Sequence, residues 1–525
     1  MSPSEPQRTR ALRLYNTRTR KVERFAPLRD DHVRVYVCGL TPSAEAHLGH
    51  ARSFMFFDVL RRYLVDLGYR VTFVQNVTDI DDRSIDAAKT SGRNWRDIVN
   101  GYFDSFKRSM TRLHVLEPDN EPRATEFIAQ ILAMIEELIA GGHAYVVADG
   151  IYFRVKSFSR YGALSGRNVD ELLVGARIAP DEKKEDPLDF ALWKFAKPDE
   201  PSWESPWGAG RPGWHIECSA MSHVLLNEPF DIHGGGYDLV FPHHENEIAQ
   251  SESLMPAPPM ANFWVHGGLL QFDNRKMSKS LGNFEPLYEL LDRHDPQAIR
   301  LLFLQTGYRK PMNFTEDSID GATSGLHRLL AAYDALREAP PAELPVDSSA
   351  EAAAIEPFAA RFYAALDDDM NTSGAVSVLF DLAAEAAALV SAGAASPAAA
   401  FIHKAMALLG ISPAERSHKS VKIEFEESVR EFVALKAPLF KIRAQKDAAR
   451  WLPVGTVDAL RVDVGGFVSL DDDAKEAVNA VIAARQQAKL DKDFGLADRL
   501  RVALKSIGVA VTDEKDGVTW TVAGG

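Results

Sequence analysis

Cysteine is scarce in this chain, which has only Cys38 and Cys218 among its 525 residues. Two cysteines cannot form the disulfide framework of a small secreted protein, and they suit a reducing compartment. Apolar runs are also short, because none reaches the roughly 18 residues that a membrane-spanning helix needs. The first segment, MSPSEPQRTRALRLYN, lacks the apolar core of a signal peptide. We therefore expect a cytoplasmic protein with no membrane association.

Basic residues are also fewer than acidic ones. The chain has 60 Lys and Arg against 74 Asp and Glu, a formal net charge of −14. This balance argues against a protein that coats nucleic acid without specificity, but a local basic face can still bind one folded RNA. The length exceeds what one hydrophobic core supports and indicates roughly three or four domains.

The first part of the chain alternates between strand and helix patterns. Residues 33–37 and 71–75 read as strands, and the amphipathic segment between them, ARSFMFFDVLRRYLVDLG, reads as a helix that ends at Gly68. Further strands are expected at 230–233 and 263–270. A strand–helix–strand unit predicts a parallel sheet with a ligand crevice at the carboxyl ends of its strands.

The segment WHIECSAMSHVLLNEPFDIHGGGYDLVFPHHENE collects residues that bind metals. It contains Cys218, and it places His243 and Glu247 four residues apart, on one face of a helix. Cysteine, imidazole and carboxylate are the ligands of zinc. We expect folding to bring these three residues together with Cys38 around one zinc ion. The alternative is that both cysteines are ordinary small buried residues.

Two short motifs indicate phosphate chemistry. His47-Leu48-Gly49-His50 follows a predicted strand and opens a helix, where backbone N–H groups favour phosphate; the alternative is that its histidines only cap the helix. The segment Lys276–Ser280 (KMSKS) lies on a glycine-flanked loop that can close over a polyphosphate; the alternative is a solvated loop. Together and in this order, the motifs are those of class I aminoacyl-tRNA synthetases.

The chain resembles cysteinyl-tRNA synthetases over almost its whole length. The matching segments are LYNTRTRKVERFAPL, VYVCGLT, HLGHARSFMFFDVLRRYL, QNVTDIDD, EPRAT, GRPGWHIECSAM, FDIHGGGYDLVFPHHENEIAQSE and KMSKSLGNF. The resemblance implies an α/β fold, with a Rossmann-type parallel-sheet catalytic domain followed by a helical bundle and a small, mostly helical C-terminal domain. Its expected domains are a catalytic domain over 1–320 with a connective insertion at about 105–213, a bundle over 321–413 and an anticodon-binding domain over 414–525. We also expect a terminal hairpin, VAVTD-EKDG-VTWTV.

The same resemblance implies the activity and the site residues. The enzyme would attach L-cysteine to the 3′ end of cysteine tRNA through cysteinyl-adenylate, using Mg²⁺-ATP, and would act as a monomer. One zinc ion per chain, held by Cys38, Cys218, His243 and Glu247, would select the substrate thiolate over a serine hydroxyl. The choice of His243 over His244 rests on the resemblance. The expected catalytic residues are His47, His50, Lys276 and Lys279. The expected ATP-binding residues are His47, Gly49, His50, Lys276, Met277, Ser278, Lys279 and Ser280. The expected cysteinyl-adenylate pocket consists of Gly39, Thr41, Asn76, Thr78, Trp214, His233, Gly236 and Asp238.

One loop departs from the family pattern. Family members commonly carry Tyr-Asp or Tyr-Asn where this chain has Ser43-Ala44, so contacts of that aromatic and polar pair are in doubt. Two other functions remain open. One is the cysteine ligase of mycothiol synthesis, which uses an amino-sugar acceptor; the continuation HHENEIAQ and the long tail disfavour it. The other is a tRNA-binding paralogue without catalysis, which the intact motifs disfavour.

Overall fold

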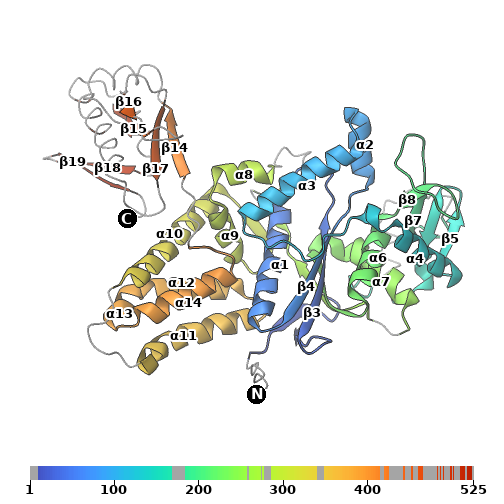
Figure 1. Cartoon of the computed structure of the whole chain (residues 1–525), viewed down its shortest axis with the longest axis horizontal. Helices are drawn as coiled ribbons and strands as arrows, with labels where there is room; N and C mark the ends of the chain where they lie inside the picture. Colours follow the sequence, from blue (N-terminus) through green and yellow to red (C-terminus); the bar gives the residue numbers. More distant parts are fainter. Residues whose placement is uncertain are drawn as a thin grey trace. The chain divides into compact units, whose positions relative to one another are not determined.

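A computed structural model describes residues 10–167, 184–256, 259–272, 275–276, 285–339 and 348–413, and beyond these only short strands and single positions between 419 and 522. Its centre is a parallel sheet with the strand order β10-β9-β3-β4. These strands are β3 (His32–Leu40), β4 (Arg70–Val77), β9 (Phe230–Gly236) and β10 (Ala261–Gly267). All four predicted strands are thereby confirmed. Helix α1 (Leu48–Asp66) connects β3 to β4, which is the crossover that a parallel pair requires (Figure 1).

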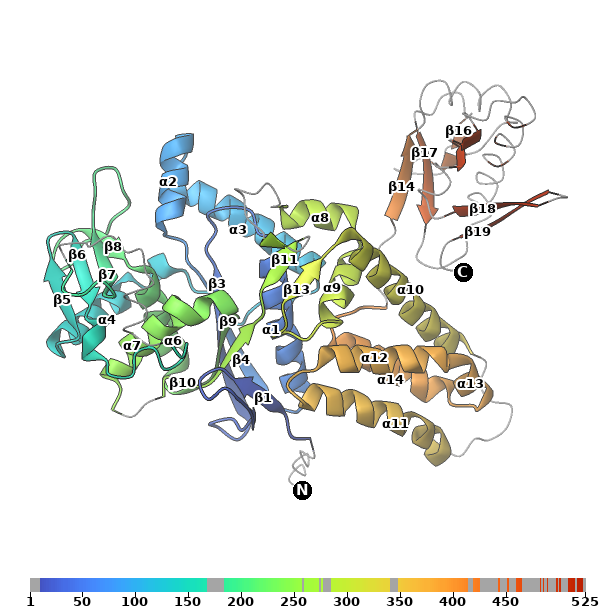
Figure 2. The same cartoon turned by 180° about the vertical axis from the view of Figure 1, so that it is seen from behind.

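The strand order places a topological switch point between β3 and β9, where a ligand crevice is expected. From β3 the chain passes outward to β4 and returns on the other side of β3 only at β9. At such a switch point the loops that follow the two strands diverge and leave space for a ligand. Strand β3 ends just past Cys38, and β9 ends in the run from His233 to Gly236. These residues therefore reach the same edge of the sheet (Figure 2).

Helices cover the sheet on both sides. Helix α1 packs against strands of the sheet with a largely apolar face, and it ends at Leu67, after which Gly68 adopts a φ of +85°. The predicted glycine stop is thus confirmed, since this left-handed conformation is easiest for glycine. Helices α6 (Trp214–Leu226) and α7 (Glu245–Leu254) lie on the other side of the sheet (Figure 2).

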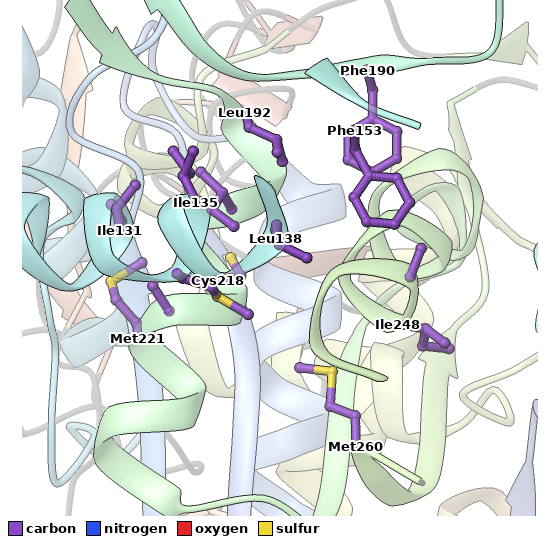
Figure 3. Close-up of a cluster of buried hydrophobic side chains, with 14 of the residues drawn as sticks. Ile131, Ile135, Leu138, Phe153, Phe190, Leu192, Cys218, Met221, Ile248 and Met260 are labelled. Atoms are coloured by element: carbon purple, nitrogen blue, oxygen red, sulfur yellow. The ribbon is translucent and has the colours of Figure 1, made fainter. Parts of the chain in front are cut away.

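The region expected for the insertion contains a small antiparallel sheet with the order β5-β6-β7-β8. Its elements are α4 (Ile128–Ala140), β5 (Ala144–Val147), β6 (Gly150–Phe153), β7 (Phe190–Phe195) and β8 (Gly210–Pro212). One hydrophobic core joins this sheet to α6 (Figure 3). Ile135 and Leu138 of α4 and Leu192 of β7 lie around Cys218 in that core. Cys218 is therefore held on the buried face of α6, inside this core.

The remaining elements before residue 316 are short or peripheral. They are β1 (Arg13–Asn16), β2 (Lys21–Arg24), α2 (Asp82–Ser91), α3 (Trp95–Arg112), β11 (Leu270–Phe272), β12 (Arg275–Lys276), β13 (Met312–Phe314), α8 (Leu287–Arg293) and α9 (Pro296–Leu304). Short helical turns lie at Ala124–Glu126, Val155–Ser157, Tyr237–Leu239 and Val240–His244.

Helices dominate the next part of the chain, as its composition predicted. They are α10 (Glu316–Glu338), α11 (Ser348–Asp367), α12 (Thr372–Ala384), α13 (Ala386–Ser391) and α14 (Ala395–Leu408). A buried arginine of α9 links this part to α1 through an ion pair and a hydrogen bond. Arg300 of α9, whose side chain is fully buried, pairs with Asp58 of α1 and donates to the carbonyl of Leu409 at 2.6 Å, just after α14. Arg300 therefore connects the C-terminal end of α14 with α1, the helix that begins within HLGH.

Beyond Pro413 the structure describes three antiparallel strand pairs. They are β14 (Lys419–Glu424) with β17 (Ala459–Val464), β15 (Ile442–Arg443) with β16 (Trp451–Leu452), and β18 (Val509–Glu514) with β19 (Gly517–Val522). The last pair confirms the predicted terminal hairpin, whereas the other two were not predicted. No helix in the described part of the chain combines the length and apolar character needed to cross a membrane.

Candidate active site

Three of the residues expected in the amino-acid pocket meet where β3 and β4 end. The backbone N–H of Gly39 donates to Asn76 Oδ1 at 2.9 Å, and Asn76 Nδ2 donates to Thr78 Oγ1 at 3.3 Å. A Cβ at position 39 would lie 1.6 Å from the carbonyl oxygen of Asn76. Glycine is therefore required for this close approach, and it fixes the Asn76 amide at the mouth of the crevice.

The two histidines of HLGH cap helix α1. His47 Nδ1 accepts from the Gly49 N–H at 3.0 Å, His50 Nδ1 accepts from the His47 N–H at 3.2 Å, and the two rings stack. The capping role is thus present in this structure, and it is compatible with phosphate binding. Burial lowers the pKa of both rings, that of His50 to about 3. Since Nδ1 accepts in each neutral ring, Nε2 carries the proton and can donate to a phosphate oxygen.

The four side chains expected around zinc converge below this crevice. All are buried, and their ligand atoms lie within 4.8 Å of one another. Cys38 Sγ lies 3.8 Å from Cys218 Sγ and 3.5 Å from Glu247 Oε1. His243 Nε2 lies 3.1 Å from the same carboxylate oxygen. Strand β3, helix α6 and the turn leading into α7 thus each bring ligand-type atoms to one point.

A second group overlaps the first. Cys38, His233, His244 and Glu247 also place one ligand atom each within 4.8 Å of the others. His244 Nε2 lies 3.3 Å from Cys38 Sγ, and His233 Nε2 lies 2.8 Å from Glu247 Oε2. The geometry alone therefore permits either group, whereas the sequence pointed to His243 as a ligand and to His233 as a neighbour of the amino acid.

The chemistry of this cluster fits a bound cation. The buried Glu247 carboxylate lies 2.8 Å from His233 Nε2, 3.1 Å from His243 Nε2 and 3.9 Å from His244 Nε2. Burial lowers the pKa of His243 and His244 far below the ordinary value, so both rings are neutral, as metal ligands must be. Burial also raises the pKa of the Cys38 and Cys218 thiols, and a cation would reverse that effect. Thiol, imidazole and carboxylate groups gathered this closely are the donor types that bind a zinc ion.

Of the other expected pocket residues, Trp214 contacts this cluster directly. The indole of Trp214 stacks on the His243 ring with a centroid distance of 4.2 Å. Asp238 follows β9 at an exposed position, and its charge raises the pKa of His47 against the stronger lowering by burial. Gly236 is crowded by Asp238, because a Cβ there would lie 2.5 Å from Asp238 Oδ1. The backbone carbonyl of Thr41 accepts a hydrogen bond from the Ser43 N–H at 2.8 Å.

The KMSKS motif is described only at its first residue. The backbone of Lys276 pairs with Gln271 in the β11–β12 hairpin. Met277, Ser278, Lys279 and Ser280 lie outside the described residues. Their expected contacts with ATP therefore stay predictions.

Several buried residues around the cluster were not predicted. His215 Nδ1 lies 2.8 Å from His243 Nδ1, and His244 Nδ1 lies 2.7 Å from His266 Nε2. Tyr36 lies two residues before Cys38 on β3, and its side chain is fully buried. The alternation of a strand puts residues 36 and 38 on one face, so Tyr36 was accessible to sequence reasoning. His266 had no such signal, since it depends on how β10 pairs with β9.

The loop that departs from the family pattern is held by hydrogen bonds from helices α3 and α8. Ser43 and Ala44 are half-buried, and the next residue, Glu45, accepts from Ser105 Oγ of α3 at 2.7 Å. At the other side of the loop, the Leu287 N–H of α8 donates to the carbonyl of Ala46 at 2.8 Å. The loop thus has fixed contacts without the aromatic and polar pair.

Comparisons with known proteins agree with this geometry. A family model described as the catalytic domain of class I (C) tRNA synthetases matches residues 24–324. A DALR domain model matches residues 361–412, and a model of the cysteinyl-tRNA ligase anticodon binding domain matches residues 471–520. Among solved structures, Mycobacterium tuberculosis methionyl-tRNA synthetase in complex with methionyl-adenylate is similar in fold. Its TM-score is 0.55 at 15% identity, over 73% of this chain and 92% of that one.

Curated relatives match over nearly their whole length. A cysteine–tRNA ligase of Alkalilimnicola ehrlichii is 44% identical over 514 residues, which cover 97% of this chain and 99% of the relative. A cysteine–tRNA ligase of Azotobacter vinelandii is 43% identical over 512 residues, with the same two coverages. With its parallel-sheet crevice and its HLGH helix, the chain belongs to the cysteine–tRNA ligase family of class I aminoacyl-tRNA synthetases.

Proposed function

We propose that this chain attaches L-cysteine to the 3′ end of cysteine tRNA in two steps. The cysteine carboxylate first attacks the α-phosphorus of Mg²⁺-ATP, which gives cysteinyl-adenylate and releases pyrophosphate. The terminal ribose hydroxyl of the tRNA then attacks the acyl carbon and releases AMP. The observation that carries this proposal is the buried cluster of Cys38, Cys218, His243 and Glu247. It lies at the same sheet edge as the histidines of HLGH.

The donor set explains how cysteine is distinguished from serine. Of the two overlapping groups, the one with Cys38 and Cys218 has two sulfur donors, which zinc binds well. A zinc ion held there would bind the substrate as a thiolate, whereas a serine hydroxyl stays protonated and is a poor ligand. Pocket shape alone separates such similar side chains by only about 1–3 kcal/mol. We therefore assign one structural and selective zinc ion per chain.

The chain's own residues position ATP and the amino acid. His47 and His50 donate from Nε2 to phosphate oxygens, at the N-terminus of α1, where the helix dipole also favours negative charge. Lys276 and Lys279 neutralise the departing pyrophosphate, and the rest of the KMSKS loop closes over ATP. No covalent intermediate with the protein is required, so orientation and charge stabilisation supply the rate enhancement.

The amino-acid pocket uses groups that are already fixed in place. The hydrogen-bonded Asn76 and Thr78 line one wall. Trp214, stacked on His243, covers the bound cysteine from the other side. His233, Gly236 and Asp238 contribute from the end of β9, with Gly39 and Thr41 from the end of β3. These roles place the substrate thiol next to the group formed by Cys38, Cys218, His243 and Glu247, which we call the sulfur-rich cluster.

The rest of the chain serves tRNA. We assign the catalytic domain to residues 1–320 with the insertion at about 105–213, the helical bundle to 321–413 and the anticodon-binding domain to 414–525. The matches to DALR and anticodon-binding models support this assignment. We infer that the enzyme acts as a monomer in the cytoplasm, where charged tRNA is used.

The test is charging of cysteine tRNA, with serine as competitor and zinc content measured on the same sample. We expect cysteine-dependent exchange of pyrophosphate into ATP, strong preference for cysteine over serine, and one zinc ion per chain. A parallel reaction offers an amino-sugar acceptor, glucosaminyl-inositol, in place of tRNA. Cysteine transfer to that acceptor alone would assign the chain to amino-sugar ligation. Failure of pyrophosphate exchange would exclude both enzymes.

A further inference from the structure

Tyr36 lies on an inner strand of the parallel sheet, and its hydroxyl group has no evident structural role. It lies on β3 opposite His233 of β9, and its side chain has no exposed surface. Its ring packs against His233 at a centroid distance of 5.3 Å and against Phe230 at 6.4 Å. These ring contacts would be equally good for phenylalanine. The oxygen atom therefore calls for a separate explanation.

The hydroxyl is not satisfied by a well-aligned hydrogen bond within the described chain. Leaving such a buried polar group unsatisfied costs about 1–3 kcal/mol, so native proteins seldom retain one. Tyr36 shares one hydrophobic core with Cys38 and Cys218, and its ring contacts His233, whose Nε2 lies 2.8 Å from Glu247 Oε2. In agreement with this placement, burial, Cys218, Cys38 and Glu247 together raise the pKa of the Tyr36 phenol. All three of these residues belong to the sulfur-rich cluster, so the orphaned hydroxyl is buried in the core that carries the proposed metal ligands.

We propose that the Tyr36 hydroxyl donates a hydrogen bond to Cys218 Sγ once that sulfur is an ionised metal ligand, and so positions it. This inference rests on the proposed zinc site. A thiol is both a weak donor and a weak acceptor, whereas a thiolate is a strong acceptor. A phenol, with an ordinary pKa near 10, keeps its proton at neutral pH and is available as donor. Tyr36 is accordingly a positioning residue and not a catalytic one.

The charge of the cluster gives this hydrogen bond a function. Two thiolates and one carboxylate carry three negative charges against the two positive charges of zinc, and the imidazole is neutral. The substrate would add a further thiolate. A donor on Cys218 withdraws negative charge from that sulfur, so the centre keeps more capacity for the substrate. Partners of this kind around metal ligands change metal affinity by about 10- to 100-fold when they are removed.

The test is Tyr36→Phe, which deletes only the oxygen atom and keeps the ring. The matched control is Tyr63→Phe on α1, a tyrosine that is equally buried but donates to Asp367 Oδ1 at 2.7 Å, away from the cluster. Zinc affinity is measured by competition with a chelator of known affinity at constant pH. We expect Tyr36→Phe to bind zinc about 10- to 100-fold more weakly, and the control to stay within about twofold of the wild type.

A second measurement reports on the sulfur itself. With Co²⁺ in place of zinc, the thiolate-to-metal absorption band should shift in Tyr36→Phe and not in Tyr63→Phe. The KM for cysteine should rise in Tyr36→Phe while the KM for ATP stays unchanged. Zinc affinity and a cobalt band equal to those of the wild type would overturn the role of Tyr36. A wild-type chain that binds no zinc would instead overturn the proposed metal site.

Discussion

Replacing Asp58 with Asn should destabilise the chain strongly, because it removes one partner of a fully buried ion pair. The Asp58 carboxylate is buried on α1 and pairs with Arg300, which has no exposed side-chain surface. It also accepts from Arg62 Nε at 2.9 Å and from the Leu116 N–H at 2.9 Å. The substitution keeps the shape of the side chain but leaves the Arg300 charge buried and unpaired.

The size of the stability loss in Asp58→Asn depends on the hydrogen bonds that Arg300 keeps. Breaking a buried pair by neutralising one partner costs about 3–5 kcal/mol. Arg300 still donates to the carbonyls of Leu409 at 2.6 Å and Leu113 at 2.8 Å, so we expect the lower end of that range. About 3 kcal/mol corresponds to roughly a hundredfold change in the unfolding equilibrium, at 1.4 kcal/mol for each factor of ten.

The stability lost in Asp58→Asn should be larger at neutral pH than at acidic pH. Burial opposes ionisation of Asp58, but Arg300 and Arg62 outweigh it and hold the pKa below the usual value. A pKa depressed by folding adds stability above the unfolded value of about 3.9 and loses it as the pH falls further. The difference between wild type and Asp58→Asn should therefore be full at pH 7 and shrink below about pH 4.

Urea unfolding followed by tryptophan fluorescence measures this difference. The matched control is Asp381→Asn, which removes the partner of Arg361 in a pair whose side chains are 44% and 55% exposed. An exposed pair of this kind is worth about 0–1 kcal/mol, so the control should unfold nearly like the wild type. Equal costs for the two substitutions, or a cost for Asp58→Asn that persists unchanged at low pH, would refute the reasoning.

Three further changes test the site and the tail. Cys218→Ser should lose zinc and the preference for cysteine over serine together, as metal analysis and competitive charging would show; one zinc ion retained per chain would contradict the ligand set. Gly39→Ala should reduce pyrophosphate exchange by more than about tenfold, because its Cβ would lie 1.6 Å from the Asn76 carbonyl oxygen; full activity would mean that β3 and β4 separate freely. Deleting residues 415–525 should leave pyrophosphate exchange largely intact but raise the KM for tRNA strongly, and unchanged charging would argue against a tRNA role for the tail.

Local patterns were sufficient for the elements near the sheet. The strand at 33–37, the helix with its stop at Gly68 and the strand at 71–75 appear as β3, α1 and β4. Each is encoded in a short run of residues, since apolar residues recur within a few positions of the chain and a glycine ends the helix. The terminal hairpin could be predicted because its two strands are neighbours in the sequence. The pair β14–β17 was missed because its strands lie far apart in the sequence, and the pair β15–β16 because each of its strands has only two residues.

The candidate site could likewise be predicted from the sequence only in part. The residue types of the 214–247 segment and the four-residue spacing of His243 and Glu247 are enough to indicate metal chemistry. Sequence could not show that His233 and His244 form a second, overlapping group with Cys38, because that depends on the parallel pairing of β3 with β9. It also could not show that both histidines of HLGH accept capping hydrogen bonds through Nδ1.

The sequence by itself determined the family, the strand–helix–strand core and the kinds of side chain available for phosphate and sulfur chemistry. These depend on local patterns and on motifs that are continuous in the chain. Only the tertiary structure decided that Cys38 and Cys218 lie 3.8 Å apart and that the Tyr36 side chain is fully buried in the same core. The reason is physical: such neighbours come from different elements, and the register and packing of the sheet, which no short segment encodes, determine which of them meet.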